Sequence, residues 1–511
     1  MKLFRKTILA FSALSIMALS SCLKEDPPFL SEASAYANVT NAKASLGGVY
    51  EAVSSFDYYG YNFLYLTYGN SGFYVSGIHN SNTATDNLFL CSLKAQPSAP
   101  YNEKTWGRIY SAIDRCNAFI QNTSIISDST NKDMADMNDF IGEAYFLRAF
   151  SYFNLVRLWG EVPLRIEQTT MHNVPKAKSS TSEIYTQILA DIAQAKKLMY
   201  HVGEQRDGYP ANEAVSMLEA KVYMTMATTD DDVPQTGENY WQKAYDAAKE
   251  VYGKYSLLSD YKALWDEEDG NNTDEAIFEL QYNDVANSNY VKLFTASKAT
   301  KGNTWGRLRM NAELIDSHDS IYPTDTIRRQ GTYVTGYMKQ NNNKYQKCYP
   351  EDTKRAKMAT AFNYLYKYWE KNTQSTVPYN FQNFKVYRYA DLLLMLAEIS
   401  NELQNGEALG YVTEVLARVG QTPQAEYNNG QDAFRRAIMY EYRYELLGEG
   451  HDWFNNRRRG YDWFKNEVIL PHNNYVNFNS NVDVTLETSK DVVMHLPIPT
   501  SEINTNSEIN N

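Results

Sequence analysis

Cysteine is scarce in this sequence of 511 residues. There are four, and Cys22 stands apart because it directly follows an apolar run near the start of the chain. The other three are Cys91, Cys116 and Cys348. Because three is an odd number, they cannot all pair in a disulfide framework, although two of them can form one disulfide bond in an oxidising compartment. Cys116 lies at helical spacing from three isoleucines, and this pattern predicts a position in the core.

Motifs of enzyme chemistry are also missing. None of the seven histidines has another histidine three or four residues away, which excludes a two-histidine metal site on one helix. There is no G-x-S-x-G elbow, no G-x-x-x-x-G-K-S/T loop and no G-x-G-x-x-G turn, so three large enzyme classes lack their signatures. With 61 acidic residues, a pair of catalytic carboxylates is not excluded, and a surface glycoside hydrolase stays an alternative.

One acidic stretch, DEEDGNNTDE at 266–275, resembles a calcium loop in composition only. In an EF-hand the glycine is the sixth residue, so Gly270 would put Trp265 where the first carboxylate belongs. A true EF-hand loop is thereby excluded. We predict no cofactor, with irregular binding of Ca²⁺ as the one option left at this stretch.

Positive charge is in deficit. The formal net charge is −12, and it becomes −15 when the basic residues Lys2, Arg5 and Lys6 are removed with the leader described next. Nucleic acids and anionic lipid headgroups bind to positive fields. The charge balance therefore argues against both as partners.

Long apolar runs are rare. The uncharged run from Ile8 to Leu19 follows the basic start and is too short to span a bilayer, which is typical of an export signal. It ends in Leu-Ser-Ser-Cys, which resembles a bacterial lipobox whose cysteine thiol is acylated. We predict a signal peptide over residues 1–21 and a lipid anchor on Cys22, because two or more acyl chains hold a protein stably at a membrane.

Tyrosine, by contrast, is abundant, with 41 residues against 8 tryptophans. Its ring offers a flat apolar face and a hydroxyl tip, which suits ligands that are partly apolar and partly hydrogen-bonding. The run at 54–74 holds six tyrosines and three phenylalanines among Gly, Asn and Ser. Two interpretations stay open: a platform on which sugar rings stack, or packing of the protein's own core.

Two further segments are polar yet carry aromatic or hydrogen-bonding residues. Residues 77–87, GIHNSNTATDN, are too polar for a core and contain Asn80 and Asp86. An irregular middle region from about 265 to 380 contains a cluster of Tyr282, Tyr290 and Trp305. We expect long loops and short strands in this region, and aromatic residues exposed on loops often bind ligands.

Helical periodicity predicts helices over the ranges 104–122, 135–159, 181–200, 212–227, 239–253, 386–404, 407–419 and 431–447. The helix at 135–159 has only a narrow polar stripe and should be buried, ending at Gly160. Residues 212–253 loosely match a tetratricopeptide repeat. We interpret two groups of basic side chains as structural rather than as part of a reactive site. They are Arg388, which we expect to pair with Asp391, and the three arginines at 457–459.

Four separated stretches together resemble the RagB/SusD family of outer-membrane nutrient-binding lipoproteins of Bacteroidetes. They are the lipobox, residues 106–164 (from WGRIYSAIDRCNAFI to FLRAFSYFNLVRLWGEVPL), residues 386–402 (VYRYADLLLMLAEISNE), and residues 442–460 with 492–503 (YRYELLGEGHDWFNNRRRG and VVMHLPIPTSEI). Their order and spacing cover nearly the whole mature chain.

The resemblance implies a mainly α-helical fold with tetratricopeptide-like helix pairs, long irregular loops and a few short strands. It divides the mature chain into an N-terminal region, 22–230, and a C-terminal region, 231–511, within one compact unit. It places the protein on the surface of the outer membrane, anchored by lipid, above a SusC-like TonB-dependent transporter.

The resemblance also implies a non-catalytic protein that captures oligosaccharides and delivers them to that transporter, with peptide capture as the alternative ligand class. Family members gather ligand contacts from the loops after the first helix and from the middle region. The predicted ligand-binding residues are Tyr74, Asn80, Asp86, Tyr290 and Trp305. Trp305 is the strongest candidate, because Gly302 and Gly306 flank it and let the backbone turn to expose the ring.

Overall fold

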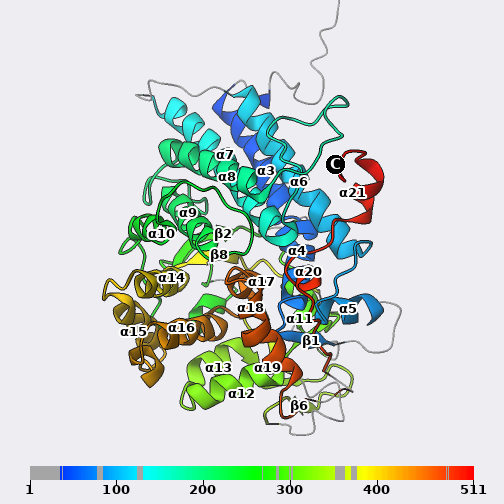
Figure 1. The fold of residues 1–511 in the computed structure, drawn as a ribbon, viewed down its shortest axis with the longest axis vertical. Coiled ribbons are helices and arrows are strands. Elements are labelled where there is room, and N and C mark those ends of the chain that lie inside the picture. Colours follow the sequence, from blue (N-terminus) through cyan, green and yellow to red (C-terminus); the bar gives the residue numbers. More distant parts are fainter. Residues whose placement is uncertain are drawn as a thin grey trace, which may run out of the picture.

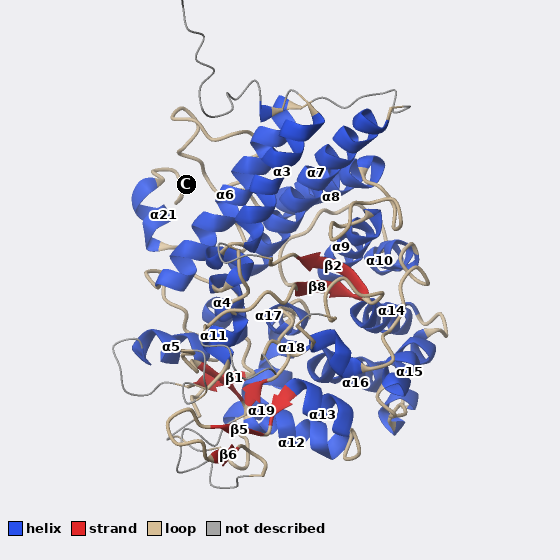
Figure 2. Ribbon diagram, turned by 180° about the vertical axis from the view of Figure 1, so that it is seen from behind, coloured by secondary structure: helices blue, strands red, loops and turns tan. Residues whose placement is uncertain are grey.

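The structure is a computed structural model that describes residues 35–510, except 37, 78–83, 124–130, 268, 284–286, 298–299, 301–302, 352–362, 370–376, 479 and 481–482. Cys22, Asn80 and Gly302 lie outside the described residues. The predicted fold class is confirmed: the described chain is mainly helical, and its strands are short and scattered (Figure 2).

Long helices packed one on the next form the scaffold. They are α3 (Val39–Ser54), α6 (Pro100–Asn122), α7 (Lys132–Trp159), α8 (Thr181–Leu198), α9 (Asn212–Met226), α10 (Tyr240–Lys249), α14 (Tyr389–Leu403), α15 (Ala408–Arg418) and α16 (Gln431–Leu446). The scaffold runs from α3, α7 and α8 at the top of Figure 1, through α9 and α10, to α14, α15 and α16 at the lower left. The predicted helices are thus confirmed, with ends that differ by a few residues.

Helix ends follow the sequence signals. Gly160 ends α7 with a φ of 71°, a conformation that favours glycine. Ser180 begins α8 with a capping box, in which its hydroxyl accepts from the backbone of Glu183 and the Glu183 side chain accepts from the backbone of Ser180. The start of the predicted helix at 386 is wrong, because residues up to Arg388 belong to a strand.

Shorter elements connect the scaffold helices. The helical ones are η1 (Phe56–Gly60), α4 (Asn62–Gly69), α5 (Ala84–Cys91), η2 (Tyr261–Trp265), α11 (Val291–Thr295), α12 (Ala312–Ile321), α13 (Thr326–Thr332), η5 (Ala425–Asn428), α17 (Asp452–Arg457), α18 (Tyr461–Phe464), η6 (Lys465–Ile469), α19 (Leu470–Asn473), α20 (Lys490–Val493) and α21 (Thr500–Thr505). The middle region is thus less irregular than its composition suggests, since it contains α12 and α13.

The strands form antiparallel pairs. They are β1 (Tyr74–Ser76) with β3 (Leu308–Met310), β2 (Ala276–Leu280) with β8 (Phe384–Arg388), β4 (Tyr333–Val334) with β7 (Tyr364–Leu365), and β5 (Gly336–Met338) with β6 (Tyr345–Lys347). In the first pair Tyr74 lies opposite Met310 and Ser76 opposite Leu308. This pair joins the segment after α4 to the middle region.

The aromatic run at 54–74 packs the core. Eight of its nine rings are buried, and only Phe56 at its start is exposed. The core that receives them is continuous and contains residues from Ala42 to Leu496. Of the two interpretations left open for this run, core packing holds for eight rings, and only Phe56 stays available to a ligand.

The three cysteines of the described chain, Cys91, Cys116 and Cys348, are buried, and they form no disulfide with one another. The predicted core position of Cys116 is confirmed. Burial raises the pKa of the Cys91 thiol and raises that of Cys116 to about 12, so both stay protonated at neutral pH.

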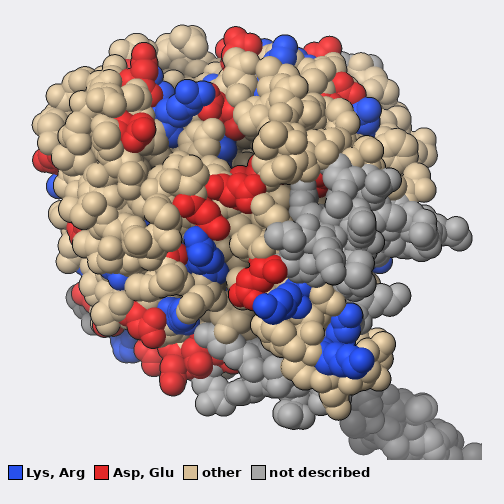
Figure 3. All heavy atoms as spheres, turned by 90° about the horizontal axis from the view of Figure 1, so that it is seen from below, with Lys and Arg blue, Asp and Glu red and all other residues tan. Residues whose placement is uncertain are grey.

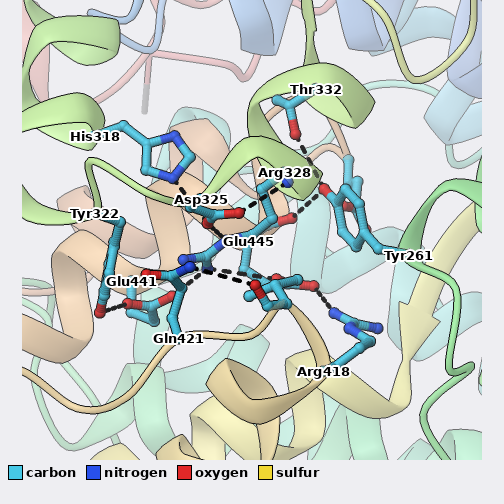
Figure 4. A network of polar contacts seen from close by, with 12 residues as sticks. Tyr261, His318, Tyr322, Asp325, Arg328, Thr332, Arg418, Gln421, Glu441 and Glu445 are labelled. Atoms are coloured by element: carbon cyan, nitrogen blue, oxygen red, sulfur yellow. Dashed lines mark hydrogen bonds and ion pairs between the residues drawn. The ribbon is translucent and has the colours of Figure 1, made fainter.

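Buried charges hold the lower helices together. Arg388 donates to Glu275 at 2.9 Å, to Glu445 at 2.8 Å and to Glu449 at 2.6 Å. The predicted pair of Arg388 with Asp391 does not form, because Arg388 belongs to β8 and points to these glutamates while Asp391 binds Lys221. Figure 4 shows the neighbouring part of the network, in which Arg328 and Arg418 bind carboxylates of α16.

The arginines at 457–459 are structural, as predicted. Arg458 and Arg459 bind the buried carboxylate of Glu398 in α14. Arg457 has its guanidinium 3.4 Å from the centre of the Trp453 ring and donates to the carbonyl of Val493 at 2.7 Å. All three therefore fix the C-terminal segment to the scaffold.

Candidate functional site

Aromatic rings, some exposed and some partly or fully buried, gather where η1, α11 and two loops meet. We call this group the aromatic surface; it consists of Phe56, Tyr61, Tyr290, Trp305, Tyr379 and Phe381. Of their side chains, Trp305 is 37% exposed, Phe56 38% and Phe381 44%. Exposed large apolar groups in contact with one another mark a site of interaction more often than scattered ones do.

The rings form a continuous series. Phe56 stacks on Tyr61, with centroids 4.6 Å apart and planes 9° apart, and Trp305 meets Tyr61 edge-on at 5.7 Å. On its other side Phe56 meets Tyr290 at 4.9 Å, almost perpendicular. Tyr61 is buried, so the exposed rings have an aromatic base beneath them.

The series continues into the loop before β8. Tyr290 lies 5.5 Å from Tyr379, and Tyr379 lies 6.1 Å from Phe381. Burial raises the pKa of Tyr61 and of Tyr290, so both hydroxyls stay protonated at neutral pH and can donate hydrogen bonds.

Backbone hydrogen bonds fix the segments that carry the rings. The amide of Tyr290 donates to the carbonyl of Gly60 at 3.0 Å, which joins the start of α11 to η1. Asn289 and Asn380 exchange two backbone bonds of 3.0 Å each, which set Tyr290 beside Tyr379. The amide of Trp305 donates to the carbonyl of Leu293 at 2.7 Å. The surface is therefore anchored through main-chain contacts rather than through the rings alone.

Glycines allow the close approach beside Trp305. Gly306 has a φ of 55°, which L side chains rarely adopt. A Cβ on Gly77 would lie 1.8 Å from the carbonyl oxygen of Gly306, and the Gly77 amide donates to Arg307 at 2.6 Å. The predicted role of Gly306 in turning the backbone is consistent with this geometry.

Polar groups border the aromatic surface. The guanidinium of Arg307 lies 4.3 Å from the centre of the Trp305 ring, and Asp57 follows Phe56 directly. Asp57 accepts from the Asn62 amide at 2.7 Å and pairs with Lys104 at 4.0 Å. Rings flanked by charged and amide groups suit a ligand with flat apolar faces and hydroxyls at its edges.

Two of the five predicted ligand-binding residues lie in the aromatic surface, Tyr290 and Trp305. Asp86 lies in the first turn of α5, and its carbonyl accepts from the hydroxyl of Tyr101 at 3.4 Å. Asp86 is connected to the aromatic surface only indirectly, because Tyr101 packs on Tyr65, which in turn stacks on Tyr61. Asn80 lies outside the described residues.

The expectation that Tyr74 lies on an exposed loop is wrong. Its side chain is 1% exposed, stacks on Tyr68 at 5.5 Å and lies 3.4 Å from Asp452. The reason is that β1 pairs with β3, which draws this residue into the core. Tyr282, from the middle-region cluster, is buried as well.

Sequence reasoning missed Tyr379 and Phe381 and did not separate Phe56 from its buried neighbours. A signal was present, because aromatic residues at 379 and 381 alternate with an asparagine. In extended chain, residues two apart point to the same side. What the sequence did not show is that this segment lies beside Tyr290.

The six side chains of the aromatic surface offer apolar ring faces and, in its tyrosines, hydroxyl groups, which are groups that bind ligands. Over the part of the chain that the structure describes, no three His, Cys, Asp or Glu side chains come together as metal ligands. At the acidic stretch, Glu275 is bound by Arg388 and Arg418. Among the described helices, none is both long and apolar enough to cross a membrane.

Comparisons with known proteins identify the family of the chain. Residues 212–511 match the family model described as "SusD family", and residues 67–224 match one described as "Starch-binding associating with outer membrane". The chain is 26% identical over 435 residues to SusD-like protein P2 of Formosa agariphila, covering 79% of this chain and 78% of that protein.

Solved structures share the fold. A SusD homolog from Bacteroides thetaiotaomicron superposes with a TM-score of 0.77 at 22% identity, covering 93% of this chain and 96% of that one. A laminarin binding SusD-like protein superposes with a TM-score of 0.69 at 21% identity, covering 92% and 98%. Since the family model spans more than half of the sequence, this chain belongs to the SusD family.

Proposed function

We propose that this protein is a non-catalytic, cell-surface glycan-binding lipoprotein. It captures oligosaccharides on the aromatic surface and delivers them to a SusC-like TonB-dependent transporter in the outer membrane. The observation that carries the proposal is the contact series from Trp305 through Tyr61 and Phe56 to Tyr290.

Several exposed rings suit an oligosaccharide better than a single sugar. Each ring that loses about half of its exposed area to a sugar contributes roughly 2 kcal/mol before entropic costs. Two or three such contacts give weak, reversible binding, which suits a protein that must release its cargo. The shared fold with a laminarin-binding SusD-like protein supports glycans as the ligand class.

The anchor completes the proposed arrangement. The lipobox cysteine Cys22 precedes residues 23–34, so a short stretch of chain separates the lipid from the first described residue, Ala35. The family-model description, association with the outer membrane, supports this location. Acylation of Cys22 and the transporter partnership are parts of the proposal.

The proposal is tested with the chain lacking residues 1–22 on a glycan panel that includes laminarin oligosaccharides. We expect saturable binding to at least one glycan class and no new reducing ends above a protein-free control. Release of reducing ends would favour a surface glycoside hydrolase instead. Binding to a parallel peptide panel, with no glycan bound, would favour peptide capture.

A further inference from the structure

One arginine beside the aromatic surface has no polar partner for its side chain among the described residues. Of the arginines that the structure describes, Arg307 is the only one whose side chain forms neither an ion pair nor a hydrogen bond. Its guanidinium lies 4.3 Å from the centre of the Trp305 ring and 5.6 Å from that of the Tyr65 ring. Its backbone is fixed, since the carbonyl of Arg307 accepts from the Gly77 amide at 2.6 Å and from the Asn87 side chain at 2.9 Å.

Stacking on the rings leaves the hydrogen-bond donors of Arg307 available. The N–H groups of a guanidinium point outward in its own plane, so contact between its face and a ring does not occupy them. Arg307 is half-buried: its Nε is buried without a partner, and its two terminal nitrogens reach solvent. Paired N–H groups of this kind bind the two oxygens of a carboxylate bidentately. A positive group with unused donors therefore lies at the edge of the aromatic surface.

The described polar groups near Arg307 do not balance its charge. The hydroxyl of Tyr61 is buried and has no hydrogen-bond partner in the described chain. Burial raises the pKa of this hydroxyl, and the nearby charge of Arg307 opposes the rise. Asp57, the carboxylate that borders the same surface, already binds Lys104 and the amide of Asn62. A partly buried charge without a counter-ion is costly, and an anion supplied by a ligand offsets that cost.

We propose that the oligosaccharide held by the aromatic surface carries an acidic group, a carboxylate or a sulfate, which Arg307 binds through its terminal nitrogens. This inference rests on the proposed glycan-binding function and specifies its ligand class. Sugar rings stack on exposed rings such as Trp305, while the acidic group accepts hydrogen bonds from the guanidinium at their edge. Carboxylate and sulfate share this chemistry, and the experiment below separates them.

The recognition of charge is local. The formal net charge of the chain is −12, which does not favour a densely charged polymer. On the face of the molecule that Figure 3 shows, the described acidic and basic residues are intermixed rather than gathered into a positive field. One guanidinium therefore selects one acidic group among neutral sugars. Because the contact is partly exposed, its contribution to affinity falls as the salt concentration rises.

The test is calorimetric titration of the full chain in detergent with matched pairs of oligosaccharides. Uronate oligosaccharides are compared with their methyl esters, and sulfated oligosaccharides with their desulfated forms. We expect at least one acidic member to bind about tenfold or more tightly than its neutral counterpart, and the kind of pair that shows the preference identifies the acidic group. Neutral members that bind as tightly in every pair would overturn this inference and leave glycan binding intact. No binding of any oligosaccharide would overturn the proposed function as well.

Variants assign the preference to Arg307. In Arg307→Gln the ratio of acidic to neutral affinity should fall to about one, because the charge is lost, whereas Arg307→Lys keeps the charge without the bidentate geometry and should retain a reduced ratio. Both should fold, since no described hydrogen bond or ion pair of this side chain is lost, and thermal melting checks this. Arg436→Gln, which removes an exposed arginine bound to Glu467 in another part of the molecule, is the control and should keep the full ratio. A full ratio in Arg307→Gln would overturn the assignment.

Discussion

Trp305 meets Tyr61 edge-on, with ring centroids 5.7 Å apart and planes at 83°. Tyr61 is buried and stacks on Phe56 and Tyr65, so the aromatic surface is the outer edge of the aromatic core. This contact holds the indole in place while 37% of the side chain stays exposed. A ring that is fixed before binding loses little entropy when a sugar stacks on it.

Replacing Trp305 with alanine should weaken glycan binding by roughly 1–3 kcal/mol, about ten- to a hundredfold, because one stacking contact is lost. The melting temperature should fall by only a few degrees, since the ring packs on Tyr61 and Arg307 but is not enclosed. Calorimetric titration and thermal melting of the same sample check both. Tyr345→Ala, which removes an exposed ring on β6, should leave affinity unchanged. Unchanged affinity in Trp305→Ala, or a fall of ten degrees or more, would mean that the indole is structural.

Arg388→Met should destabilise the protein by about 3–5 kcal/mol, because it leaves the buried carboxylates of Glu275, Glu445 and Glu449 short of one cation. Arg115→Met, which breaks a partly exposed pair with Glu51, should cost no more than about 1 kcal/mol. Urea unfolding of both variants at pH 7 gives the comparison. Equal losses would show that the buried network does not hold the lower helices together.

Glu398 should make stability depend on acid pH. The guanidinium groups of Arg458 and Arg459 lower its pKa from 4.5 to about 2 against the opposing effect of burial. Because the folded-state pKa lies below the unfolded one, this contribution is complete above about pH 4.5 and is lost as the pH falls towards 2. It amounts to about 3 kcal/mol.

Glu398→Gln lacks this titration, so the difference in unfolding free energy between wild type and variant should shrink as the pH is lowered from 6 towards 3. Urea unfolding at several pH values measures it. A difference that stays constant across this range would mean that Glu398 is not held ionised by the two arginines.

Cys22→Ala should abolish acylation, since no other thiol directly follows the apolar leader, and should remove the protein from the outer-membrane fraction. Labelling with palmitate and membrane fractionation check both effects. Cys91→Ala is the matched control, because that thiol is buried and should not be acylated in either protein. Normal labelling of the Cys22 variant would refute the lipobox interpretation.

The long helices could be predicted because their apolar residues recur at helical spacing and their ends carry signals such as Gly160 and Ser180. By contrast, α12 and α13 are short and rich in charged residues, so local pattern did not reveal them. Composition also could not tell buried aromatic residues from exposed ones, since the buried Tyr65 and the exposed Phe56 occur in the same run.

The aromatic surface could be predicted only in part, because long-range backbone pairing assembles it. Trp305 and Tyr290 stood out in a polar region. The bridge between Asn289 and Asn380, which brings Tyr379 into contact with Tyr290, leaves no signal in the local sequence. Tyr74 was misplaced for the same reason, since its burial depends on pairing with a distant strand.

The most direct test of the central claim is a crystal structure of this protein with an oligosaccharide that the panel identifies. The account predicts one sugar ring in van der Waals contact with the indole of Trp305 and a further ring against Tyr290 or Phe381. An oligosaccharide seated elsewhere, with the aromatic surface empty, would contradict it.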